Sequence, residues 1–213
     1  SISGNWDNNG TFVHQDNTVT FKGTGAQTVD SGGDNFYNIT VNKTAGTLQL
    51  VTNNLTQAAG GALTFTDGTI DLNSLTWTLG DDLTYGNANN PLFDLNNGTL
   101  TDGGSGYSVT VNQGILRADG TSDLTIGDLT VNANADVDVG TGTFTAGAMT
   151  VNDGDFTQTG DNSGNTHQVT SLTVAGGTCA WDSGLARYDE PEDIREHVRA
   201  AMWHPDYRPY IAV

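Results

Sequence analysis

Val109-Thr110-Val111-Asn112 recurs in near-copies along almost the whole chain, so its pattern is the main evidence for the fold. In every copy the first and third residues are apolar and the second is Thr, which is the alternation of a half-buried strand. Successive copies start 20 to 26 residues apart. They start at Val19, Ile39, Leu63, Leu83, Val109, Leu129, Met149 and Leu172. A repeat of this length predicts a solenoid in which each repeat forms one turn.

We call the four-residue motif above the repeated word. Two further sets of short strand-like motifs, also called words, lie between its copies. One set has a polar residue between two apolar ones, as in Ile70-Asp71-Leu72 and Phe93-Asp94-Leu95, and the other includes Leu75-Thr76-Trp77. Three short strands per turn, separated by Gly, Asn and Asp, predict an all-β fold, a single-stranded parallel β-helix of about eight turns over residues 1–184. Gly and Asn supply the left-handed backbone angles that its corners need.

The chain is strongly acidic, with 25 Asp and Glu against 7 Lys and Arg and a net charge of −18. Such a surface repels phosphate groups, so we expect no nucleic-acid partner and no attraction to anionic lipid. No apolar run approaches the roughly 20 residues that cross a bilayer, so we expect no membrane insertion. The single cysteine, Cys179, excludes an internal disulfide, and its inward position predicts a buried structural thiol.

Residues 185–213 differ in composition, with three of the four prolines and four of the seven basic residues. An apolar stripe at helical spacing, Ile194, Val198 and Met202, predicts a short α-helix that closes the stack. The rest of this segment is predicted to be an extended aromatic tail, which we expect to dock on another copy of the chain or on another structural protein. The docking candidates are Trp203, Tyr207, Arg208, Tyr210, Ile211 and Val213.

Several turns are rich in carboxylates that could hold Ca²⁺. They are Asp81-Asp82, Asp136 with Asp138, and Asp153 with Asp155. No loop of the roughly 12-residue calcium-binding type is present, and the four histidines lack the partner cysteines of a zinc site. Solvated turn acids explain the pattern better, so we expect neither a metal nor another cofactor.

Asp71 and Asp94 are the candidates for a carbohydrate site. They occupy the middle of the same strand word in adjacent turns, so they would stack about 5 Å apart, close to the carboxyl separation of a retaining glycosidase. Any solenoid with outward Asp produces such a pair, and a lyase for acidic sugars would need more cations than Lys22, Lys43 and Arg117 supply. We therefore expect no enzyme, and a surface glycan stays an alternative partner.

The Thr residues of the repeated word form an outward row from Thr20 to Thr173. Regular Thr arrays on flat β-solenoids are also the binding surfaces of some ice-binding proteins. The position after the word's third residue varies here, from Lys22 to Asn112 and Ala175, so this row does not make a Thr-x-Thr plane. Stacking of β-branched side chains explains the row.

The segment from Gly4-Asn5-Trp6 through Val19-Thr20-Phe21 to Phe36-Tyr37-Asn38-Ile39-Thr40-Val41 resembles Asn/Thr/Gly-rich β-solenoid repeats. Such repeats occur in bacterial surface proteins of the adhesin and autotransporter-passenger type, and in phage fibres and spikes. The likeness covers residues 4 to 183 and implies a scaffold.

We therefore expect a non-catalytic structural or adhesion protein on the surface of a virion or a cell. A phage virion component is favoured, because the repeat begins within a few residues of Ser1 without an export signal and the chain is short for an adhesin. The alternative is a bacterial surface adhesin or extracellular filament subunit whose leader has been removed. A second alternative is a carbohydrate-binding or polysaccharide-cleaving β-helix protein.

Overall fold

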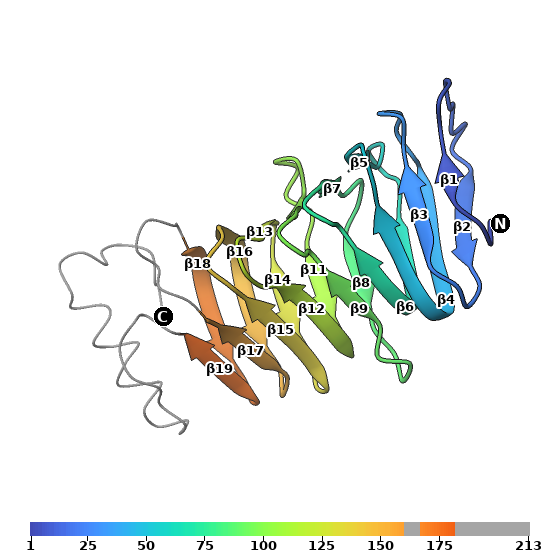
Figure 1. Ribbon diagram of the computed structural model, residues 1–213. Helices are drawn as coiled ribbons and strands as arrows, with labels where there is room; N and C mark the ends of the chain where they lie inside the picture. The colour runs from blue at the N-terminus through green and yellow to red at the C-terminus, as the bar shows by residue number, and fades with distance from the viewer. Residues whose placement is uncertain (160–166, 182–213) are drawn as a thin grey trace.

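The structure is a computed structural model that describes residues 1–159 and 167–181. Its strands stack into an elongated rod that runs from β1 and β2 at the N-terminal end to β18 and β19 (Figure 1). All pairings between the described strands are parallel. The predicted all-β parallel β-helix is confirmed, with about seven turns and no helix in the part that the structure describes. The predicted C-terminal helix and tail, residues 185–213, lie outside the described residues.

The rod has three faces, and the repeat face is the one that carries the repeated word. It contains β2 (Thr18–Lys22), β8 (Leu83–Tyr85), β11 (Val109–Val111), β14 (Leu129–Val131), the first halves of β4 (Asn38–Leu50) and β6 (Leu63–Asp71), and the second halves of β16 (Phe144–Val151) and β18 (His167–Val174). These eight stacked strands enclose about seven turns, which accounts for the difference from the predicted eight.

The other two faces take the names acidic face and threonine face from their outward side chains. The acidic face contains the second halves of β4 and β6 with β1 (Trp6–Asp7), β3 (Gln27–Asp30), β9 (Leu92–Asp94), β12 (Gly114–Ala118), β15 (Ala135–Val139), β17 (Asp155–Gln158) and β19 (Thr178–Trp181). The threonine face contains β5 (Leu55–Thr56), β7 (Thr76–Thr78), β10 (Thr99–Thr101), β13 (Asp123–Thr125) and the first halves of β16 and β18.

From β8 onward the neighbouring turns of the repeat face are paired in register, so equivalent residues stack along the rod. Thr110 on β11 is paired with Thr84 on one side and with Thr130 on the other. Val109 and Val111, which flank Thr110, are fully buried. The alternation predicted from the repeated word is therefore confirmed on the repeat face.

The interior is a continuous stack of aliphatic and aromatic side chains. Trp77 is its largest fully buried side chain, and Trp77 Nε1 donates a hydrogen bond of 2.9 Å to Oε1 of the buried Gln57. Phe93 packs against Phe65 and Trp77, with ring centroids 6.2 and 5.8 Å apart. Because each turn covers the apolar side chains of the next, burial of this surface is the main stabilising contribution.

Asn and Gly form many of the corners, as the sequence predicted. Asn73, Asn96 and Asn97 have φ angles of +49°, +42° and +60°. Gly86 has a φ of +111°, and a Cβ at this position would collide with the backbone of Gln113. These left-handed angles suit Asn and Gly because other residues with a Cβ rarely adopt them.

Lys43, near the N-terminal end of the rod, is buried and hydrogen-bonded to neighbouring turns, so it is not a surface cation. Its Nζ donates hydrogen bonds of 2.6 Å to the Gly25 carbonyl oxygen and 2.7 Å to Gln27 Oε1. The Gln27 side chain in turn donates 2.6 Å from Nε2 to the Gly4 carbonyl oxygen. Burial lowers the pKa of the Lys43 amine. The chain thus connects its first residues to β4 through a network of hydrogen bonds.

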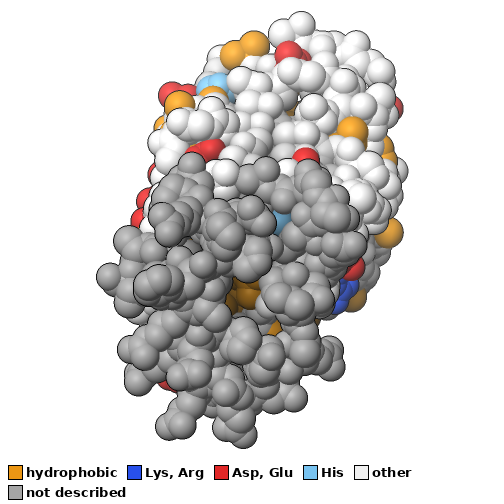
Figure 2. All heavy atoms as spheres, turned by 90° about the vertical axis from the view of Figure 1, so that its left-hand side faces the viewer, with side chains coloured by type: hydrophobic (Ala, Val, Ile, Leu, Met, Phe, Trp, Pro, Cys, Tyr) orange, Lys and Arg blue, Asp and Glu red, His pale blue; other side chains and the backbone are white. Residues whose placement is uncertain are grey.

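The described surface is mostly polar. Figure 2 shows, over the described part of one end view, mainly uncharged polar groups and backbone with isolated acidic and hydrophobic side chains. Among the described residues, the exposed large hydrophobic side chains are Val13 and Val174. No helix in the described part of the chain is long and apolar enough to cross a membrane.

Candidate functional site on the acidic face

The acidic face brings together carboxylates from successive turns, because its strands are paired in register. Asp71 on β6 is paired with Asp94 on β9. Arg117 on β12 follows, paired with Asp94 on one side and with Asp138 of β15 on the other. The predicted stacking of Asp71 on Asp94 is therefore present, and the column continues over a guanidinium to a further carboxylate.

Asp71 uses its carboxylate to hold the corner that follows its strand. Its Oδ1 accepts hydrogen bonds from the Asn73 backbone N–H at 2.8 Å and from Asn96 Nδ2 at 3.0 Å. Its Oδ2 accepts a third from Gln49 Nε2 at 2.7 Å. Asp71 therefore caps its own turn and joins it to the turns on either side.

Asp94 has the same role one turn later. Its Oδ1 accepts a hydrogen bond of 3.1 Å from the Asn96 backbone N–H, and its Oδ2 lies 3.5 Å from Nη1 of Arg117. Burial raises the pKa of the Asp94 carboxyl, against smaller lowering effects from the Asn96 hydrogen bond and Arg117. Both turns have the sequence Asp-Leu-Asn, which is the local signal for this corner.

Asp136 and Asp138 on β15 extend the negative patch. Burial is the largest cause of the raised pKa of each carboxyl. Repulsion from Asp138 also raises the pKa of Asp136, while Arg117 lowers the pKa of both. The arrangement can hold a proton at a higher pH than an isolated Asp can, and it favours cations over anions.

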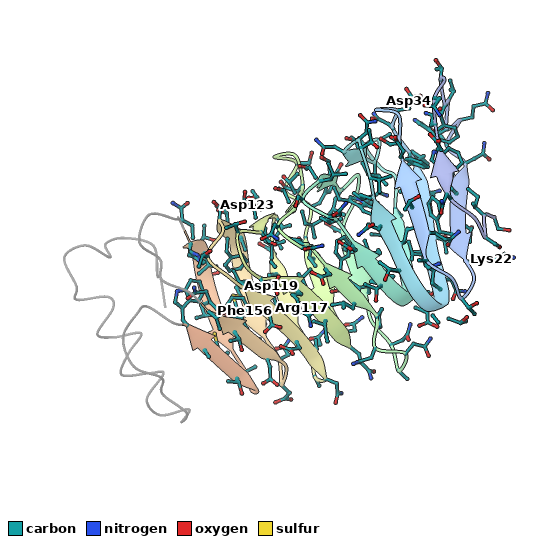
Figure 3. The ribbon with its side chains drawn as sticks, viewed as in Figure 1. Lys22, Asp34, Arg117, Asp119, Asp123 and Phe156 are labelled. Carbon is teal, nitrogen blue, oxygen red and sulfur yellow. The ribbon has the colours of Figure 1, made fainter. Side chains whose placement is uncertain are left out.

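The acidic face has a single cation within reach of these carboxylates among the described residues. Arg117 lies in the middle of the rod, whereas Lys22 lies at its N-terminal end (Figure 3). Lys43 is buried. The sequence analysis considered these three side chains as the cations that a lyase for acidic sugars would need on one face, but the structure does not bring them together.

Of the Asp-rich turns singled out for Ca²⁺, the Asp81-Asp82 turn uses its carboxylates in hydrogen bonds to the backbone. Asp82 Oδ1 accepts 2.8 Å from the Ser108 backbone N–H, and Asp81 Oδ1 accepts 2.8 Å from the Asp82 backbone N–H. Asp153 has a φ of +57° at its corner. In residues 1–159 and 167–181, no group of three or more His, Cys, Asp or Glu side chains is placed to hold a metal ion.

Asp102 is a structural carboxylate that the sequence reading missed. It is buried, and its two oxygens accept hydrogen bonds of 2.8 Å from the backbone N–H groups of Gly104 and Gly106. The signal was Asp immediately before a Gly-rich loop, where an Asp side chain can fold back onto the backbone.

Cys179 is buried on β19, as the sequence predicted, and burial raises its pKa to about 11. A thiol with this pKa is a poor nucleophile at neutral pH. The docking candidates in residues 185–213, including the stripe of Ile194, Val198 and Met202, lie outside the described residues.

Comparison with protein-family models, with curated proteins and with solved structures finds no match to this chain. The architecture given above therefore rests on the strand pairing and burial of the chain itself.

Proposed function

We propose that this chain is a non-catalytic structural or adhesion rod displayed on the surface of a virion or a cell. A phage virion component is the setting that we put first, and a bacterial surface adhesin or extracellular filament subunit is the alternative, since the repeats resemble those of both. Attachment to a partner, or to another copy, is assigned to residues 185–213 on the basis of their aromatic and basic sequence.

The observation that carries the proposal is what the carboxylates on the acidic face do. Asp71 accepts three hydrogen bonds, and Asp94 is shared between a corner N–H and Arg117. A glycosidase needs one carboxyl free to donate a proton and another free to attack or to activate water. The carboxylates of Asp71 and Asp94 instead stabilise the corners and the contacts between turns, which suits a rigid structural protein.

The contacts between turns also support a structural role. Backbone hydrogen bonds join neighbouring turns on the acidic and threonine faces and, apart from the step between β6 and β8, on the repeat face. A buried apolar stack runs through the described turns. Repeat architectures of this kind spread contacts between neighbouring turns along the whole length. A net charge of −18 also keeps the rod soluble and resists non-specific association.

The second alternative, a carbohydrate-binding or polysaccharide-cleaving protein, is favoured by one observation. Asp94, Asp136 and Asp138 have raised pKa values on one face, and perturbed carboxyls in a group are typical of acid–base sites. Their partial burial explains the shifts without catalysis, so we place this reading second.

The Asp71→Asn, Asp94→Asn double variant separates the two readings. Purified wild-type protein is expected to release no reducing ends from a panel of neutral and acidic polysaccharides, and the double variant is expected to behave in the same way. The matched control is Asp16→Asn in the N-terminal segment, whose carboxylate lies off this face. Release of reducing ends by the wild type and the control, but not by the double variant, would replace the structural proposal with the enzymatic one.

A further inference from the structure

The threonine face carries a regular two-column array of Thr side chains. In one column Thr76 is paired with Thr99, which is paired with Asp123, and Thr143 follows in the next turn. The other column is continuous over five turns, in which neighbouring members are paired in register. Its members are Thr56, Thr78, Thr101, Thr125 and Thr145. Thr76-Trp77-Thr78 and Thr99-Leu100-Thr101 thus stack directly, and Thr143-Phe144-Thr145 continues the Thr-x-Thr plane beyond the intervening Asp123-Leu124-Thr125.

Buried side chains under the threonine face support the Thr array. The residues between the two columns are Trp77, Leu100, Leu124 and Phe144, and all are fully buried. The register shifts found between described strands lie between β4 and β6, away from the threonine face. Strands lie about 4.8 Å apart, and alternate residues of one strand about 6.7 Å apart. The hydroxyls and methyls therefore occupy a near-rectangular grid with a rigid support.

Most hydroxyls of this grid are available to water. Within the described residues, Thr101 Oγ1 accepts a hydrogen bond from the Gly103 backbone N–H, and the other Thr hydroxyls of the grid have no protein partner. The Asn residues that follow the repeated word bond to one another, since Asn132 and Asn152 donate from Nδ2 to Oδ1 of Asn112 and Asn132, at 2.7 and 3.1 Å. The repeat face therefore has one column of open Thr hydroxyls beside an Asn ladder, whereas the threonine face has two columns of outward side chains side by side.

The threonine face also carries little charge. Asp123 is the one carboxylate in its two columns among the described residues, and its Oδ1 accepts a hydrogen bond of 2.6 Å from the Thr143 backbone N–H (Figure 3). The acidic face, by contrast, carries Asp71, Asp94, Asp136 and Asp138. A ligand for the threonine face must therefore be neutral and must itself repeat in two dimensions.

We propose that the threonine face binds ice. Oxygen atoms on the prism planes of hexagonal ice repeat in two directions with spacings near those of the Thr grid, so hydroxyls can enter the lattice while methyls order the water between them. A crystalline polysaccharide fits less well, because sugar rings bind to exposed aromatic rings and the aromatic residues here, Trp77 and Phe144, point inward. Ice binding goes beyond the display role, and either can fail without the other.

The full chain is expected to show thermal hysteresis and to partition into a growing ice front. The double variant Thr99→Tyr, Thr125→Tyr places two bulky rings in the grid and is expected to lose most of both activities. The matched control is Thr110→Tyr, Thr130→Tyr, which makes the same changes at half-exposed positions of the repeat face and is expected to keep both. Thermal unfolding midpoints of the two variants establish that each is folded.

Asp123→Thr tests the same grid without added bulk. This variant completes the first column, so its thermal hysteresis is expected to exceed that of the wild type. The proposal is overturned if the wild type neither shows hysteresis nor enters ice, or if the two Tyr double variants lose activity equally. Lower activity in a folded Asp123→Thr variant would also contradict it.

Discussion

Replacing Val131 by Asp is expected to lower the free energy of unfolding by roughly 3–5 kcal/mol, since it leaves a buried charge without a partner. Val131 is fully buried on β14, where it is paired with Val111 on β11 and with Val151 on β16. The carboxylate would face the apolar stack with no cation or donor from these neighbours. Because turns support one another, the damage would extend to the turns on both sides.

Thr130→Ala is the matched control, one residue away on the outward side of the same strand. Its hydroxyl has no hydrogen-bond partner among the described residues, so the loss is expected to stay below about 1 kcal/mol. Denaturant unfolding followed by circular dichroism measures both variants. Equal unfolding midpoints would contradict the inward and outward assignment of the repeated word.

Arg117→Gln is expected to destabilise the protein at pH 7 by about 0.5–1 kcal/mol, a value discounted for the partial exposure of the ion pair. Arg117 lowers the pKa values of Asp94, Asp136 and Asp138 in the folded protein. These pKa values already lie above the unfolded value of 3.8, mainly through burial, so the ionised carboxylates weaken folding. Removing the guanidinium makes their ionised forms less favourable still.

The pH dependence of this difference follows from the same pKa shifts. A raised folded pKa means that the folded state binds more protons than the unfolded state, so each of these carboxyls favours folding more as the pH falls toward 3.8. Once these carboxyls are protonated, they carry no negative charge, so Arg117 no longer stabilises them electrostatically. Urea unfolding at low salt should therefore show a gap between wild type and Arg117→Gln at pH 7 that shrinks toward pH 3.8. A gap of the same size at both pH values would rule out the electrostatic explanation.

The sequence predicted the stacked architecture because its signal is local. Alternation within words such as Val109-Thr110-Val111 fixes which side is buried, and the repeat length fixes which words stack. Leu116 escaped the reading of the second strand set although it is paired with Phe93 and Val137. Its word is Leu116-Arg117-Ala118, in which Arg117 takes the polar middle position that Asp94 and Asp138 hold in the neighbouring turns. The third position holds the small Ala118, where the neighbouring words have Leu95 and Val139, so the apolar signal of this word is weaker.

The role of the site residues was harder to predict than their position. The stacking of Asp71 on Asp94 follows from equal positions in adjacent turns. The hydrogen bonds that these carboxylates accept come from Asn73 and Asn96, and they depend on the left-handed backbone angles of those two corner residues. The Thr-x-Thr grid depends on register as well. Thr76-Trp77-Thr78 is visible in the sequence, but which Thr it meets in the next turn is set by the lengths of the intervening corners.

Immunogold electron microscopy with antibodies against residues 1–181 tests whether this chain is a rod displayed on a surface. Intact virions and intact, unpermeabilised cells from the source are labelled in parallel, with a cytoplasmic protein as the negative control. Gold on the outside of virions is the predicted result, and gold on intact cells alone would move the rod to the bacterial alternative. Label that appears only after the cells are permeabilised, with none on virions, would contradict the proposed surface display.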